Sequence, residues 1–122
     1  MNLTTIGRII FALTIAFFGI AHLTNAQSMA QMIPSLSGMA VPVVYITGAC
    51  LLAAAVSFIL NRYSFYAGIL LAVFLFLVIL LIHLPGMSSP DAMMAQTSMS
   101  MMLKDAAIAS AALVIAGIGT KK

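Results

Sequence analysis

The chain contains the segment Ser64–His83, which reads SFYAGILLAVFLFLVILLIH and has no charged side chain before its final histidine. A helix of about 20 apolar residues rises about 1.5 Å per residue, so it matches the hydrocarbon core of a bilayer, which is about 30 Å thick. Pro85 and Gly86 follow directly and predict the end of this helix. The segment therefore predicts a transmembrane helix, and we interpret the rest of the chain as its partners.

The composition places the whole chain in a membrane. Of its 122 residues, 64% are hydrophobic and 6% are charged, whereas soluble domains carry about 25% charged residues. The length and composition predict a single integral membrane domain over residues 1–122. The net charge of +3 comes from scattered residues, so no nucleic-acid partner is predicted. Cys50 is the only cysteine, which excludes an intrachain disulfide and a paired-cysteine redox mechanism within this chain.

Three further apolar segments predict an all-α fold, a bundle of four membrane-spanning helices. The predicted spans cover residues 6–24, 42–60, 64–84 and 102–119. The first segment also fits a cleavable signal peptide, because Arg8 precedes its apolar run and small residues follow it. Cleavage there would leave three spans. The Asn61–Tyr63 turn is so short that the second and third spans must be antiparallel neighbours.

The two longer connections are expected to carry short helices at the membrane surface. In the first connection, Met29, Met32 and Ile33 fit one apolar face of such a helix. In the second, Ser88-Ser89-Pro90-Asp91 is typical of a helix start, with a serine cap, a proline in the first turn and an acid near the positive helix end. We expect this short helix to be separate from the fourth span.

The basic residues predict the orientation of the bundle. The side with both termini and the short turn holds four of them, Arg8, Arg62, Lys121 and Lys122. The other side holds only Lys104, next to Asp105. Cytoplasmic loops carry the excess of lysine and arginine, so we expect a multi-pass protein of the cell (inner) membrane with both termini in the cytoplasm.

Small residues predict where the helices approach each other closely, because packing rather than hydrophobicity holds membrane helices together. The middle of the second span reads Gly48-Ala49-Cys50, and we interpret Cys50 as a buried packing residue. The fourth span has two pairs of small residues at four-residue spacing, Ala107/Ala111 and Ala112/Ala116.

Four polar side chains fall at the outer ends of the predicted spans. His22 ends the first span, His83 ends the third, and Lys104 and Asp105 open the fourth. Ionisable groups at membrane depth indicate function by default, and together these four predict a pocket for a polar substrate or a quinone headgroup. The competing interpretation is that each side chain reaches water or headgroups at a helix end. The two histidines also fit bis-histidine haem ligation, although an outer helix end offers little enclosure.

Methionines gather in the two outer connections. The second connection holds five candidate ligands, Met93, Met94, Met99, Met101 and Met102. Thioethers are soft ligands that suit Cu(I), so a copper site on the outer face is an alternative hypothesis. The competing interpretation is that methionine is a flexible apolar filler for interfacial helices and adaptable partner surfaces.

Several segments together resemble the DoxX family of small four-span membrane proteins. The resemblance covers GRIIFALTIAFFGIAHLTN, MIPSLSGMAVPVVYITGACLLAAAVSFILNRYS, LLIH and MMLKDAAIASAALVIAG. It rests on loose motifs, which are Gly7-Arg8, Gly19/His22, Met32/Pro34, Thr47-Gly48 and Lys104-Asp105. Many relatives carry a glutamate about three residues after the second-span glycine, whereas this chain has Leu51 there.

The resemblance implies a redox or sulfur-stress context, since the members that give the family its name are subunits of a thiosulfate:quinone oxidoreductase. We therefore expect a membrane subunit that supports a quinone-linked or sulfur/thiol oxidoreductase complex, with quinone as the cofactor it would meet. The expected partners are the lipid bilayer and an oxidoreductase, and the chain could also form a homo-oligomer. Copper binding at the outer face and a non-catalytic role as an assembly partner are the alternatives, and no catalytic residue is predicted.

Overall fold

The computed structural model describes residues 2–122, and every regular element in that range is a helix. Four stretches are long and apolar enough to cross a membrane: Leu3–Thr24, Ala40–Leu60, Ser64–Gly86 and Ala92–Ile118. The predicted fold class, an all-α four-helix membrane bundle, is therefore confirmed. In chain order the elements are α1 (Leu3–Thr24), α2 (Ala26–Ala30), η1 (Pro34–Met39), α3 (Ala40–Leu60), α4 (Ser64–Val78), η2 (Ile79–His83), α5 (Leu84–Gly86) and α6 (Ala92–Ile118).

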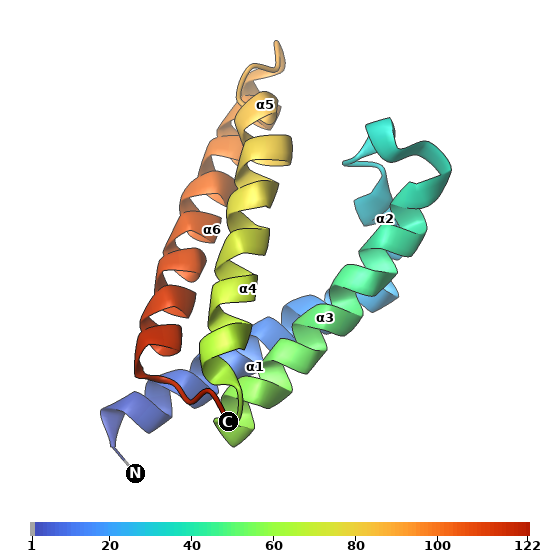
Figure 1. Ribbon diagram of the computed structural model, residues 1–122. Coiled ribbons are helices and arrows are strands. Elements are labelled where there is room, and N and C mark those ends of the chain that lie inside the picture. Colours follow the sequence, from blue (N-terminus) through green and yellow to red (C-terminus); the bar gives the residue numbers. More distant parts are fainter. Residues whose placement is uncertain (1) are drawn as a thin grey trace.

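The long helices form two pairs. α1 packs against α3, and α4 packs against α6, while the contact between α3 and α4 joins the two pairs. Figure 1 shows that the pairs meet near the two ends of the chain and diverge toward the other end of the bundle. We call the end with both termini the terminal face and the other end the opposite face. The two pairs are therefore closest at the terminal face, and buried residues from all four long helices form one core between them.

Hydrogen bonds hold the terminal face together. Ser64 is fully buried; its Oγ donates to Asn61 Oδ1 at 2.8 Å and accepts from the Thr120 N–H at 3.0 Å. Thr120 Oγ1 donates to the Asn61 carbonyl at 2.7 Å. The turn between α3 and α4 is thus tied to the chain that follows α6. Arg8 of α1 adds a bond from Nε to the Phe58 carbonyl of α3 at 2.8 Å.

Within each pair, small residues set the closest approach. A Cβ atom added to Gly48 would lie 3.0 Å from the Gly19 carbonyl oxygen, so α1 and α3 cross glycine to glycine. A Cβ added to Gly68 would lie 2.5 Å from the Ala112 carbonyl oxygen and 2.8 Å from Ala116 Cβ, so α4 and α6 are equally close. The predicted roles of Gly48 and of the Ala112/Ala116 pair are confirmed.

Two of the expected packing residues lie elsewhere. Cys50 is exposed, so its interpretation as a buried packing residue is wrong. Ala107 is also exposed, and the Ala107/Ala111 pair does not form the contact with α4. The reason is helical phase: Ala112 and Ala116 lie on the face of α6 that meets Gly68, and Ala107 lies on another face.

The fourth span is longer than expected. A helix starts near Asp91 as predicted, but Asp91 itself is the cap, with its Oδ1 accepting from the Met93 N–H at 3.0 Å. The expected serine cap and the proline in the first turn are therefore wrong, since Pro90 precedes the helix. The expected break before residue 102 is absent, because α6 continues from Ala92 to Ile118. Its first turns contain neither glycine nor proline, and their alanines and methionines favour helix. Lys104 and Asp105 therefore lie in the middle of a helix and not at its start.

The helix of the third span also extends beyond its expected end. Pro85 and Gly86 were expected to end it, yet α5 continues through both. A π-helical turn, η2, precedes Pro85 and accommodates the missing N–H of the proline. In the first connection, α2 and η1 are short helices, and Met29 and Ile33 pack toward α3. Met32 is 53% exposed and does not share that packing face.

Candidate functional site

A buried histidine and a buried aspartate meet between α4 and α6. His83 Nε2 lies 2.9 Å from Asp105 Oδ2. The residues are 4% and 9% exposed, and they are two of the three buried polar residues in the described part of the chain. No other hydrogen bond of the His83 ring is present within residues 2–122, so the second ring nitrogen, Nδ1, is left for water or a ligand.

The π-helical turn positions His83. On α4, Gly68, Ala72 and Leu75 are buried against the core at helical spacing. A turn that contains one extra residue delays the helical rotation, so His83 follows on this buried side while Ile82 is only half-buried. π-helical turns inside α-helices are frequent at functional sites.

The depth of the pair in the membrane determines the free-energy cost of burying it. Asp105 lies thirteen positions before Ile118, the last residue of α6, which corresponds to about 20 Å along the helix. A hydrocarbon core about 30 Å thick that begins at the terminal face would contain this level. Ionisable groups at such depth are rare and face the bundle interior, as here. The competing interpretation is that the pair only joins α4 to α6.

The structure separates the other two predicted site residues from this pair. Lys104 is exposed, and its Nζ lies 5.7 Å from the centroid of the Phe18 ring on α1, a cation–π distance. His22 Nδ1 lies 2.7 Å from the Phe18 carbonyl oxygen, and His22 Cβ faces Gly48. His22 therefore lies in the α1–α3 pair, with its ring bonded within α1, and Lys104 reaches from α6 across to α1.

The methionine-rich stretch forms the first turns of α6. Met93, Met94 and Met99 are 77%, 57% and 45% exposed. At about 100° per residue, the five candidate thioethers are distributed around the helix and do not converge on one point. Within residues 2–122, no three His, Cys, Asp or Glu side chains are placed to hold a metal ion. This arrangement favours the interpretation of the methionines as an adaptable apolar surface.

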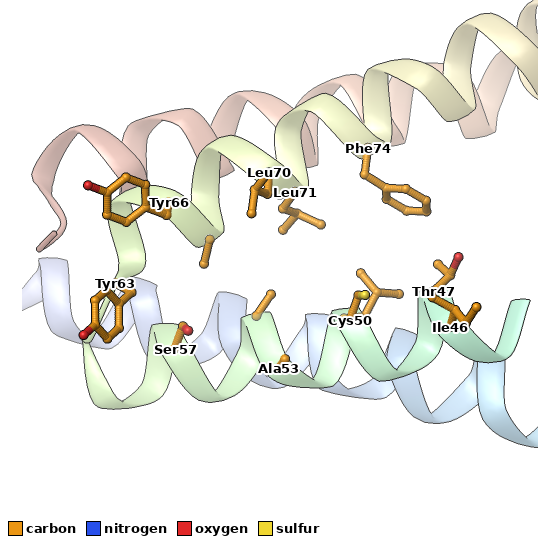
Figure 2. A pocket seen from close by; sticks show the side chains of 13 residues that line it. Ile46, Thr47, Cys50, Ala53, Ser57, Tyr63, Tyr66, Leu70, Leu71 and Phe74 are labelled. Atoms are coloured by element: carbon orange, nitrogen blue, oxygen red, sulfur yellow. The ribbon is translucent and has the colours of Figure 1, made fainter. Parts of the chain in front are cut away.

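A cleft between α3 and α4 is the second candidate site. It has a volume of about 550 Å³, and its walls are almost entirely apolar. Figure 2 shows Thr47 and Cys50 on α3 facing Leu71 and Phe74 on α4, with Tyr63 at the end near the turn. Sequence reasoning missed this cleft, because small residues on a membrane helix indicate close contact as readily as open space.

The fold and the two features define the chain as a helical membrane protein with four candidate spans. Comparison with protein-family models, with curated proteins and with solved structures finds no match to this chain. The resemblance to the DoxX family stays a prediction, and the function has to be argued from the buried pair and the cleft.

Proposed function

We propose that the protein is a membrane subunit that binds a quinone headgroup beside His83 and Asp105 and supports an oxidoreductase complex, as its resemblance to the DoxX family implies. The observation that carries the proposal is the burial of this pair, the only buried ionisable side chains in the described residues 2–122. Replacement of a buried ion pair by well-packed apolar residues is often neutral or stabilising. Apolar residues at positions 83 and 105 would hold the helices together at lower cost. A role in binding accounts for the presence of the histidine and the aspartate.

The chemistry of the side chains fits a quinone. A quinone has two carbonyl oxygens that accept hydrogen bonds. When the ring of His83 carries both protons, Nε2–H donates to Asp105 and Nδ1–H can donate to a quinone carbonyl. Ligand sites are mostly apolar with a few polar groups that fix the orientation. A bound quinone would supply two-electron redox chemistry, while His83 would hold or exchange a proton at its ring and Asp105 would orient the ring.

The quinone content of the purified protein tests this proposal. We expect wild-type protein, extracted in mild detergent and analysed by chromatography of its lipid extract, to contain about one quinone per chain. His83→Gln keeps an amide donor for Asp105 but removes the second ring nitrogen, and should lower the content about tenfold or more, the effect of losing a hydrogen bond of about 1.5 kcal/mol.

His22→Gln is the matched control, because His22 lies on the other helix pair, where its ring is hydrogen-bonded to the Phe18 carbonyl. This variant should keep its quinone. Circular dichroism and elution volume must match the wild type for both variants. Wild-type protein without quinone, or equal quinone content in His83→Gln and wild type, would rule the proposal out.

We also propose that the terminal face lies in the cytoplasm, because it carries four of the five basic residues. We expect a fluorescent protein fused after Lys122 to be fluorescent in cells. We expect an alkaline phosphatase fused at the same position to be inactive, since that enzyme requires an oxidising compartment. The opposite pair of results would invert the orientation.

A further inference from the structure

The cleft between α3 and α4 has no role in the proposed function, and its chemistry identifies a different ligand. We propose that the cleft binds an acyl chain of an anionic phospholipid, drawn from the leaflet on the terminal face, with the phosphate beside Arg62 and Lys122. The inference is independent of the quinone proposal, because His83 and Asp105 do not line the cleft.

The length of the cleft fits one leaflet. On α4 its walls run from Tyr63, just before the helix, to Phe74, and eleven residues of helix span about 16 Å. Half of a hydrocarbon core about 30 Å thick is about 15 Å. The volume of about 550 Å³ falls within the range of about 300–1,000 Å³ that is typical of ligand sites. An acyl chain that enters at the terminal face would therefore fill the cleft without crossing the bilayer midplane.

The shape of the cleft fits a flexible chain. Ala53 and Ala54 on α3 and Ala67 on α4 leave space in its middle, where larger side chains would close the gap. Figure 2 shows Tyr63 and Tyr66 together at the end near the α3–α4 turn. Tyrosine is enriched at membrane–water interfaces, so this end is the level at which a headgroup would lie.

The charges at this end select an anionic headgroup. Arg62 and Lys122 are exposed, and the Tyr63 N–H donates to the Lys122 carbonyl at 3.0 Å, which keeps the end of the chain beside the entrance to the cleft. The chain has only two acidic residues: Asp105 pairs with His83 and Asp91 caps α6 at the opposite face. Basic residues between membrane helices attract anionic headgroups from the cytoplasmic leaflet.

Native mass spectrometry tests the ligand directly. The protein in detergent is mixed with phosphatidylglycerol or phosphatidylcholine of identical acyl chains, and the lipids that stay bound after release from the micelle are counted. We expect phosphatidylglycerol to be preferred about fivefold for each basic residue involved. The double variant Arg62→Gln, Lys122→Gln should bring the ratio of the two lipids close to one.

A matched pair of alanine substitutions tests the location. Ala53 and Ala107 are both exposed on membrane helices, but only Ala53 lines the cleft. Ala53→Leu should abolish retention of phosphatidylglycerol, while Ala107→Leu should leave it unchanged. Cys50 lines the cleft and is the only thiol, so bound phosphatidylglycerol should also slow its alkylation by N-ethylmaleimide severalfold.

Four results would overturn the inference: equal retention of both lipids by the wild type, unchanged retention in Ala53→Leu, alkylation of Cys50 that does not respond to lipid, or a lipid-free dimer, which would show that a second copy covers the cleft. His83→Gln should retain phosphatidylglycerol like the wild type. The lipid test and the quinone test can therefore fail independently.

Discussion

Asp105→Ala is expected to lower the free energy of unfolding by about 2–3 kcal/mol. Interhelical hydrogen bonds in membranes contribute about 0.6–1.7 kcal/mol. Breaking a buried pair in a soluble protein costs about 3–5 kcal/mol, and the expected value lies between these two ranges. A value above the membrane range applies because His83 is 4% exposed and its Nε2 would lose its hydrogen-bond partner. The loss should appear as unfolding at a lower fraction of sodium dodecyl sulfate in mixed micelles, followed by far-ultraviolet circular dichroism.

A double-mutant cycle separates the pair from its surroundings. His83→Ala in the Asp105→Ala background should cost less than His83→Ala alone, with a coupling energy of about 1–2 kcal/mol. Asp91→Ala is the control, since Asp91 is an exposed cap that accepts from the Met93 N–H and its loss should cost about 1 kcal/mol or less. Additive effects of His83→Ala and Asp105→Ala would show that the 2.9 Å contact contributes nothing.

The fold was predictable from the sequence to within a few residues at most helix ends. Ser64–His83 is apolar for the length of a bilayer core, and the Asn61–Tyr63 turn permits only an antiparallel arrangement of its neighbours. Hydrophobicity and turn length fix these features locally, without knowledge of the partners. The start of α6 at Ala92 was not predictable in this way, because a helical stretch of methionine and polar residues is less apolar than a span and was interpreted as a separate helix.

The candidate site was predictable in residue type and only partly in geometry. Topology brings the end of the third span and the start of the fourth to the same side, which suggested that His83 and Asp105 meet. The same reasoning added His22 and Lys104, which instead contact Phe18 of α1. His22 lies on the other helix pair, which diverges from α4 and α6 toward the opposite face (Figure 1). Lys104 lies on α6 but faces away from the buried side that holds Asp105. A hydropathy pattern does not contain the side-chain packing that fixes these directions.

Gly68→Ala is expected to destabilise the protein by about 1–3 kcal/mol, the cost of adding atoms to a well-packed contact. The added Cβ would lie 2.5 Å from the Ala112 carbonyl oxygen, a backbone atom that cannot rotate away. The two helices must therefore separate or tilt. Gly117→Ala is the matched control, because a Cβ there meets nothing within 4 Å. Gly117 lies one residue before the end of α6, so its loss should stabilise by at most about 0.5 kcal/mol. If Gly68→Ala destabilises the protein and Gly117→Ala stabilises it, the loss at Gly68 comes from the contact with α6 and not from helix propensity.

The same substitution tests whether α4 and α6 behave as one rigid pair. Gly68 and His83 both lie on the side of the third span that meets α6, near its two ends. If the helices move apart as rigid bodies at Gly68, the His83–Asp105 contact lengthens, and the coupling energy of the double-mutant cycle should fall in the Gly68→Ala background. If the π-helical turn lets η2 adjust independently, the coupling energy stays at its wild-type value while the overall stability still drops. The first result is expected, because α4, η2 and α5 run on as one continuous helical segment from Ser64 to Gly86.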